Sequence, residues 1–243
     1  MAKTAGNHLQ DPERLKRRPL LVAHRGASTR APENTLEAFH TALDLDADGV
    51  ELDVHETADG RFAVHHDPDL PDGPIRDLPL AAIRGRPAKY GGEVPSLGDA
   101  LGLMARRRPG YVVCVEIKGM RSWERLRREL APWRDALHLE IQSFDIAYLR
   151  EMAAEPDGHL RGVIALEPGP DPVALLGESG AVGLSLLQDR ITADLAAALH
   201  AAGKRLYAWT VNDPARAREL AAAGVDAIIT DDPETIGPAL ASR

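Results

Sequence analysis

The sequence predicts an α/β protein folded as a (β/α)8 barrel, with a short hairpin excursion after the second strand. Its 243 residues fit the roughly 250 residues typical of that fold. Short apolar runs rich in valine, isoleucine and leucine alternate with longer alanine-rich segments, a pattern typical of a parallel sheet whose strands are joined by helices. Glycines at Gly203 and Gly224 directly follow two of these helical segments, where helix C-caps are expected.

Eight strands are expected in chain order, each followed by a helix, and eight fit a closed barrel better than an open sheet. Ala193–Ala202 and Asp213–Ala223 show the clearest helical pattern. Arg61–His66, after an Asp-Gly turn, predicts the hairpin excursion, and we expect Asp67–Pro95 to be a loop with at most one short helix. The predicted strands are Leu20–Ala23, Gly49–Val54, Tyr111–Ile117, His138–Gln142, Arg161–Leu166, Val182–Leu186, Arg205–Val211 and Asp226–Thr230.

Composition indicates an ordinary globular protein, with 44% hydrophobic and 27% charged residues. We predict a polar tail over residues 1–19 and a single domain over residues 20–243. The formal net charge of −8 argues against binding to nucleic acid or to an anionic membrane surface. No apolar run is long enough to span a bilayer, and no signal-peptide core is present, so we predict no stable membrane anchoring. The single cysteine, Cys114, is consistent with a cytoplasmic location, and composition does not decide the oligomeric state.

Two of the predicted strands carry acidic side chains at alternate positions. Glu51 and Asp53 share one face of their strand, and Glu116 and Lys118 share one face of the next. Two alternatives are compatible with these positions. Glu51 and Asp53 would lie in water if their strand were antiparallel with one polar face, and Lys118 would form an internal ion pair with Glu116 or Asp53. Barrel strands are covered on both faces, however, so inward acids need partners or a cation. Three converging carboxylates, Glu51, Asp53 and Glu116, favour one divalent cation, Mg²⁺ or Ca²⁺, and Lys118 offers a positive charge to an anion.

Histidines lie at two places where a barrel would hold reactive groups. His24 and Arg25 end the first strand, where a proton carrier and a phosphate-binding fork would face the site. A second histidine pair, His65 and His66, ends the hairpin excursion, and periodicity alone does not show which of the two points inward. Trp209 ends the seventh strand and is expected either to line a binding wall or to fill the core.

One further acidic residue ends the eighth strand. Asp231 follows Thr230, and a helix is expected to start near Pro233. Acidic residues at this position commonly cap a helix, and proline is favoured in the first turn. For Asp231 we therefore predict a helix cap rather than a role in the site.

Together the motifs resemble those of the glycerophosphodiester phosphodiesterases. The matching blocks occur in family order and span about residues 20–238. They are His24-Arg25-Gly26, Ala31–Phe39, Val50–Val54, Val64-His65-His66-Asp67, Pro95-Ser96-Leu97, Glu116-Ile117-Lys118, Gln142–Asp145, Trp209–Asn212 and Thr230–Pro233.

The resemblance implies a TIM barrel that uses a divalent cation to hydrolyse glycerophosphodiesters to sn-glycerol 3-phosphate and an alcohol. By motif it implies that His24 and His66 are the general acid and base and that Arg25 and Lys118 contact the phosphate. It also implies that the metal ligands are Glu51, Asp53 and Glu116. The residues leave open whether water or the 2-hydroxyl of glycerol attacks first. Many members carry a larger insertion where Asp67–Pro95 stands, so a more open mouth is expected here.

Two other functions are compatible with the same motifs. One is a lysophospholipase D-like enzyme acting on amphiphilic substrates, which needs an apolar patch at the barrel mouth. The aromatic content of 4% argues against it. The other is a barrel that binds glycerophosphate without turning it over, which the intact set of histidines, acids and lysine disfavours. Choline release from glycerophosphocholine, with and without EDTA, distinguishes the three.

Overall fold

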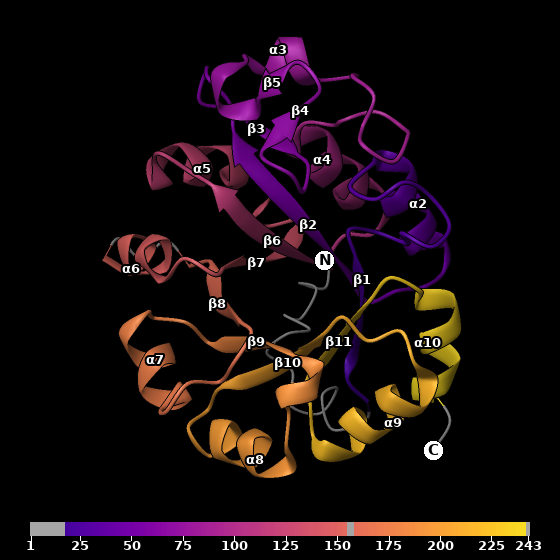
Figure 1. The fold of residues 1–243 in the computed structure, drawn as a ribbon, viewed down its shortest axis with the longest axis vertical. Helices are drawn as coiled ribbons and strands as arrows, with labels where there is room; N and C mark the ends of the chain where they lie inside the picture. The colour runs from indigo at the N-terminus through magenta and orange to yellow at the C-terminus, as the bar shows by residue number, and fades with distance from the viewer. Residues whose placement is uncertain (1–17, 155–157, 242–243) are drawn as a thin grey trace, which may run out of the picture.

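In the computed structural model, which describes residues 18–154 and 158–241, eight parallel strands close into a ring (Figure 1). The first strand pairs with both the second and the last, so the barrel has no open edge. The predicted fold is confirmed, and each predicted strand lies within two residues of the observed one. The strands are β1 (Leu20–His24), β2 (Gly49–Glu56), β6 (Tyr111–Gly119), β7 (Leu137–Ser143), β8 (Leu160–Ala165), β9 (Gly183–Leu187), β10 (Arg205–Trp209) and β11 (Ala227–Thr230).

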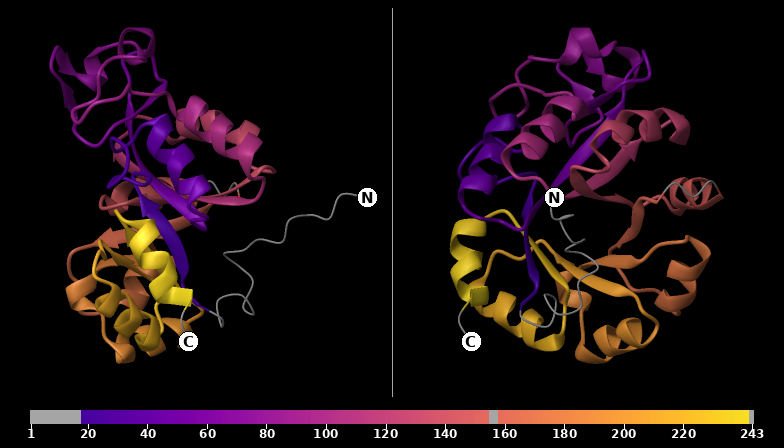
Figure 2. Two further views of the ribbon diagram at one scale, coloured as in Figure 1. Left: turned by 90° about the vertical axis from the view of Figure 1, so that its right-hand side faces the viewer. Right: turned by 180° about the vertical axis from the view of Figure 1, so that it is seen from behind.

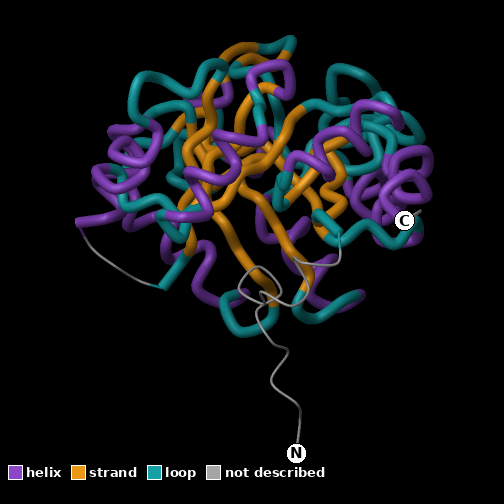
Figure 3. Tube along the Cα trace, turned by 90° about the horizontal axis from the view of Figure 1, so that it is seen from below, coloured by secondary structure: helices purple, strands orange, loops and turns teal. Residues whose placement is uncertain are grey.

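Helices surround this ring, and Figure 3 shows the strands at the centre with helices and loops outside them. Local signals explain several helix ends. Thr35 caps α2 (Leu36–Asp44) by accepting from Ala38 N. Gly224 is the C-cap of α9 (Pro214–Ala223), as predicted, and has the left-handed conformation. The helices are α2 (Leu36–Asp44), α4 (Leu97–Arg107), α5 (Trp123–Leu130), α6 (Ile146–Ala154), α7 (Pro172–Glu178), α8 (Ala193–Ala201), α9 (Pro214–Ala223) and α10 (Pro233–Ala241). Among the described residues, no helix is both long and apolar enough to cross a bilayer.

The hairpin excursion after β2 is present and is larger than expected. Strand β3 (Phe62–Val64) pairs antiparallel with the end of β2, as predicted. The following segment, expected to be mostly loop, also forms a small hairpin of β4 (Asp69–Leu70) and β5 (Gly73–Pro74) and a short helix, α3 (Leu80–Ile83). It has its own apolar cluster, formed by Ala63, Leu70, Ile75, Leu80, Ile83 and Val94. The excursion projects from the ring (Figure 2).

The inside of the barrel is divided between an apolar and a polar layer. Alternate residues of each strand point inward. At the N-terminal ends these include Leu20, Val22, Val112 and Cys114, which form a buried apolar cluster. Towards the C-terminal ends the inward positions of β2 and β6 are acidic or basic, so the chemistry lies at the end of the barrel where active sites of this fold occur.

The predicted polar tail, residues 1–19, lies outside the described residues except for its last two. Arg18 is described, and its guanidinium contacts Asp48 at 2.6 Å. Asp48 also accepts a hydrogen bond from Leu21 N at 2.9 Å, so this ion pair braces the start of β1.

Candidate active site

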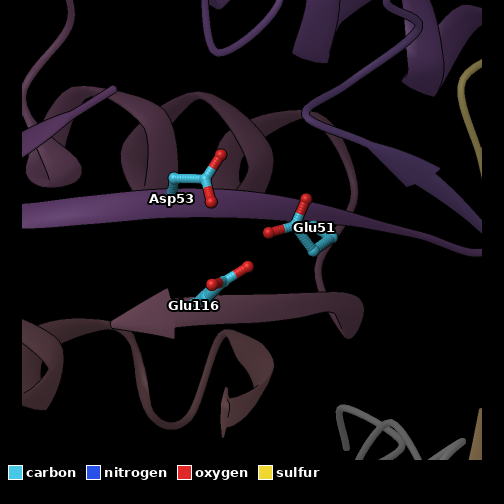
Figure 4. A group of neighbouring side chains, drawn as sticks. All are labelled: Glu51, Asp53 and Glu116. Carbon is cyan, nitrogen blue, oxygen red and sulfur yellow. The ribbon is translucent and has the colours of Figure 1, made fainter. Parts of the chain in front are cut away.

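The three predicted carboxylates meet at the C-terminal end of the barrel. Glu51 and Asp53 extend from β2, and Glu116 extends from β6, where it is in register with Asp53. One oxygen from each lies within 4.8 Å of the others, and all three side chains are buried. Figure 4 shows the three carboxylates close together, with Asp53 and Glu51 along β2 and Glu116 on the side of β6 that faces β2. The alternation of faces in Val50–Val54 therefore correctly predicted an inward acidic pair.

Three buried oxygens of the cluster accept no hydrogen bond among the described residues, and two of them, Asp53 Oδ1 and Glu116 Oε1, face Lys118 instead. The Asn34 side chain holds Asp53 from two sides, donating to Oδ2 at 2.8 Å and accepting from the Asp53 backbone N at 3.2 Å. Glu51 Oε2 accepts from the backbone N of Arg25 at 3.1 Å. Glu51 Oε1 is buried and has no hydrogen-bond partner within residues 18–154 and 158–241. A buried carboxylate oxygen without a donor, beside two further carboxylates, fits a hard cation.

The charges in this cluster change the pKa values of its members. Burial raises the pKa of Glu51 well above its usual value, and the charges of Asp53 and Glu116 add to the effect. Burial and Asp53 raise the pKa of Glu116 to about 7. Burial also acts to raise the pKa of Asp53, but Arg25 and Lys118 outweigh it and keep that pKa below its ordinary value. The acids thus repel one another in a site poor in water, and a divalent cation would relieve that repulsion.

Two basic side chains adjoin the cluster. Lys118 Nζ lies 2.7 Å from Glu116 Oε1 and 3.4 Å from Asp53 Oδ1. Arg25 Nε lies 3.2 Å from Asp53 Oδ2, and its Nη1 donates to Glu33 at 3.0 Å. Lys118 therefore forms the internal ion pair that the sequence allowed and also lines the pocket described below, as does Arg25.

A turn after β1 positions His24 and Arg25. Both Arg25 and Gly26 have positive φ, 56° and 85°. A Cβ on Gly26 would lie 2.6 Å from the backbone and Cβ of Ala38, so only glycine allows α2 to approach this turn. The turn directs the backbone N of Arg25 at Glu51 and places the His24 imidazole beside the cluster, with Nε2 3.9 Å from Glu51 Oε2.

His24 has a carboxylate partner that the sequence analysis assigned to another role. His24 Nδ1 lies 2.7 Å from Asp231 Oδ1. The predicted capping role for Asp231 is wrong, because Asp232 accepts from Thr235 N in the first turn of α10. The interaction with His24 keeps the pKa of Asp231 below its ordinary value, although burial opposes this. An ionised Asp231 can only accept, so His24 Nδ1 carries a proton and Nε2 is the nitrogen on the side of Glu51.

The second histidine is held by a chain of polar contacts. His66 Nδ1 lies 2.8 Å from Asp67 Oδ1, and Lys89 Nζ donates to Asp67 Oδ2 at 2.6 Å. These two contacts lower the pKa of Asp67 to about 2. His66 lines the pocket, whereas the His65 Nδ1 is 2.9 Å from the backbone oxygen of Asp67. The structure thus places in the site the histidine that the family motif favours.

A neighbouring histidine supports His66 and was not predicted to have a part in the site. His55, at the end of β2, has Nε2 3.1 Å from the carbonyl oxygen of His66. Burial lowers the pKa of His55. A carbonyl oxygen only accepts, so Nε2 is the protonated nitrogen and ties the backbone of His66 to β2.

All of the predicted site residues except Asp53 line one pocket of about 220 Å³. Asp53 lies beneath it, against Lys118. Trp209 forms part of the wall, as one of the two predicted alternatives stated, and meets Phe144 edge to face with ring centroids 5.8 Å apart. The lining residues are His24, Arg25, Glu51, His66, Glu116, Lys118, Gln142, Phe144, Ile164, Ser185, Trp209, Thr210 and Ile229.

This geometry agrees with comparisons to known proteins. A family model described as the glycerophosphoryl diester phosphodiesterase family matches residues 24–235. A glycerophosphodiester phosphodiesterase of Caldanaerobacter subterraneus subsp. tengcongensis is 32% identical over 235 residues, which cover 89% of this chain and 96% of that protein. One from Bacillus altitudinis is 27% identical over 237 residues, covering 88% and 95%.

A solved structure shows the same fold over nearly the whole barrel. A phosphodiesterase of Oleispira antarctica, in complex with the product sn-glycerol-3-phosphate, matches with a TM-score of 0.84 and 28% identity, covering 93% of this chain and 98% of that one. The family model spans most of the chain, and the match to the Caldanaerobacter enzyme is nearly end to end. This chain belongs to the glycerophosphoryl diester phosphodiesterase family and is a phosphoric diester hydrolase.

Proposed function

We propose that this chain hydrolyses glycerophosphodiesters to sn-glycerol 3-phosphate and an alcohol, using a divalent cation and two histidines. The observation that carries the proposal is one pocket in which the imidazoles of His24 and His66 flank the carboxylate cluster and Lys118. The product complex of the Oleispira relative supports the choice of substrate class.

The charges of the cluster support a cation of charge two. Glu51, Asp53 and Glu116 carry three negative charges when ionised, and Arg25 and Lys118 carry two positive ones, which leaves one net negative charge. A divalent cation, Mg²⁺ or Ca²⁺, held by the three carboxylates supplies charge neutralisation for the phosphoryl oxygens. The resulting net positive charge matches a phosphodiester monoanion.

The two histidines supply proton transfer. The free Nε2 of His24 can take a proton from the attacking hydroxyl group, whether it belongs to water or to the glycerol 2-hydroxyl. Asp231 stabilises the imidazolium that forms. His66, paired with Asp67, can protonate the departing alkoxide. Each transfer is worth roughly 10²–10⁴-fold in rate. Arg25 and Lys118 line the same pocket and contact the equatorial phosphoryl oxygens in this proposal.

The decisive experiment measures choline release from glycerophosphocholine. We expect turnover with Mg²⁺ or Ca²⁺, none with EDTA, and losses of at least about 100-fold in His24→Ala and His66→Ala with the fold retained. His40→Ala is the matched control, because His40 is an exposed histidine of α2 and should leave the rate unchanged. Full activity in either site variant would refute the acid–base roles, and saturable binding without turnover would indicate a binding protein.

One observation favours amphiphilic diesters as a second substrate class. Phe144 follows β7 and is 46% exposed, and Leu166 follows β8 and is 57% exposed, so two large apolar side chains lie at adjacent strand ends of the rim. Two exposed apolar side chains at the rim support the apolar patch that a lysophospholipase D-like enzyme requires. Comparing lysophosphatidylcholine with glycerophosphocholine tests this, because activity confined to the lysolipid would make it the main function. A cytoplasmic location and the absence of nucleic-acid binding remain predictions from composition.

A further inference from the structure

Gln142, on β7, is a pocket residue whose side chain keeps one hydrogen-bond acceptor unused among the described residues. Its side chain is 1% exposed and lines the pocket next to Glu116. Gln142 Nε2 donates to Glu140 Oε1 at 2.9 Å. Its other polar atom, Oε1, is buried and has no hydrogen-bond partner in the part of the chain that the structure describes. A buried acceptor without a donor is unfavourable, so a ligand that brings a donor to this oxygen gains affinity.

The direction of the Gln142 amide is set by residues deeper in the barrel. Glu140 is fully buried and its Oε2 accepts from the hydroxyl of Tyr207 at 2.8 Å, so its Oε1 is left for the amide N–H of Gln142. Turning the amide over would place its carbonyl oxygen against this carboxylate. Gly162 on β8 provides the space, since a Cβ there would lie 2.6 Å from Glu140 Oε1 and 3.1 Å from Gln142 Cγ.

The acceptor stands close to the place where the phosphate is expected. Gln142 and Glu116 are in register on neighbouring strands, which are about 4.8 Å apart. Lys118 lines the same pocket two residues further along β6. Because Gln142 lies this close to the expected phosphate position, we expect the substrate group that reaches it to be one bonded directly to the phosphorus. In a glycerophosphodiester the part common to all substrates is glycerol, whose hydroxyl groups are hydrogen-bond donors.

We propose that Gln142 Oε1 accepts a hydrogen bond from a hydroxyl group of the substrate's glycerol moiety. This inference rests on the proposed function. Glu140 is a positioning residue that keeps the acceptor pointed at the substrate, and Gly162 gives the pair its room. A diester without hydroxyl groups leaves Oε1 buried and unpaired, so the pocket selects glycerol esters over alkyl esters of the same length.

The test compares two chromogenic diesters, glycerol 4-nitrophenyl phosphate and propyl 4-nitrophenyl phosphate, which differ only in two hydroxyl groups. The wild-type chain with Mg²⁺ or Ca²⁺ should prefer the glycerol ester in kcat/KM. Gln142→Met keeps the side-chain length but removes the acceptor. We expect it to lower kcat/KM for the glycerol ester about 10–100-fold and to leave the propyl ester unchanged or faster. Ser143→Ala is the control, because Ser143 is buried next in sequence and bonds Ile117 O outside the pocket.

A second variant keeps the test valid where Gln142→Met fails to fold. Glu140→Gln is nearly isosteric and lets the Gln142 amide turn either way, so the preference for the glycerol ester should fall in the same direction. Binding of sn-glycerol 3-phosphate against propyl phosphate, measured by calorimetry, gives a readout that does not need turnover. Equal losses on both esters in these variants would overturn the inference, whereas a wild type that hydrolyses neither diester would instead refute the proposed function.

Discussion

Replacing Asp231 with asparagine tests whether the carboxylate behind His24 contributes to the reaction. Asp231→Asn keeps the shape of the side chain and removes its charge. In the wild type one oxygen accepts from His24 Nδ1 at 2.7 Å and the other from Asn212 Nδ2 at 2.7 Å. An asparagine has an NH₂ group in place of one of the two oxygens, so one of the two donors would face an N–H group. Either His24 loses the partner that sets its tautomer, or the two amide groups of residues 212 and 231 face each other donor to donor.

The size of the effect follows from burial and charge. A hydrogen bond to a charged group is worth about 1.5–3 kcal/mol. The Asp231 side chain is 31% exposed, so solvent screens part of its field and the lower end of that range applies. A loss of about 1.4 kcal/mol in transition-state stabilisation corresponds to about a tenfold fall in kcat. Since Asp231 does not line the pocket, KM should change little.

The assay is steady-state choline release from glycerophosphocholine at saturating cation, with thermal unfolding measured in parallel. Asp232→Asn is the matched control, because Asp232 Oδ1 accepts from Thr235 N at the start of α10 and does not contact His24. It should leave kcat unchanged and alter only the melting temperature. An Asp231→Asn enzyme with wild-type kcat, or a control with the same loss, would refute the assignment of Asp231 to the histidine.

Variants at three further residues report on other parts of the site. Glu51→Gln should weaken the affinity for Mg²⁺ or Ca²⁺ by more than about tenfold in calorimetry, since it replaces the carboxylate whose Oε1 has no protein donor. Without cation, stability should fall as pH rises from about 4.3 to about 7, because the pKa of Glu116 is raised in the folded chain and the protonated form is the favoured one. Glu116→Gln should flatten this dependence in melting experiments, and an unchanged slope would contradict it. His55→Ala should lower kcat while the Gln variant restores part of it through a new N–H to the His66 carbonyl, and equal losses in both would contradict a positioning role.

The sequence predicted the barrel well because its strands are buried on both faces. Such strands appear in the sequence as short, nearly continuous apolar runs. Glycine marks the ends of helices such as α9. The same logic revealed the carboxylates, since two acids at alternate positions are costly inside a barrel unless they bind something. The excursion was predicted less well because its apolar residues follow neither the periodicity of a helix nor the alternation of a strand. Its small core around Ile75 and Ile83 is assembled by turns and one helix of four residues.

One residue that was missed, Asp231, has a role that depends on closure of the ring. Asp231 looks like a helix cap along the chain, since it precedes Pro233. Closure places β11 against β1, with Thr230 in register with Ala23. The residue after Thr230 is thereby brought beside the residue after Ala23, which is His24. The first and last strands of a closed barrel must pair, so a predicted barrel already implies that the ends of these two strands are adjacent. That adjacency was the signal that could have identified Asp231 as a neighbour of His24.

The same reasoning explains why the carboxylate cluster and the histidines gather at one end of the barrel. A polar side chain facing inward is costly unless it is paired, and Leu20, Val22 and Val112 make the opposite end apolar. At the functional end the polar atoms are mostly paired with one another, as His24 is with Asp231. Among the described residues, Glu51 Oε1 and Gln142 Oε1 accept no hydrogen bond. An acidic oxygen and an amide oxygen left unpaired on neighbouring walls call for different ligands, a cation for the first and a hydroxyl donor for the second. A cation-dependent reaction on a hydroxylated phosphodiester supplies both.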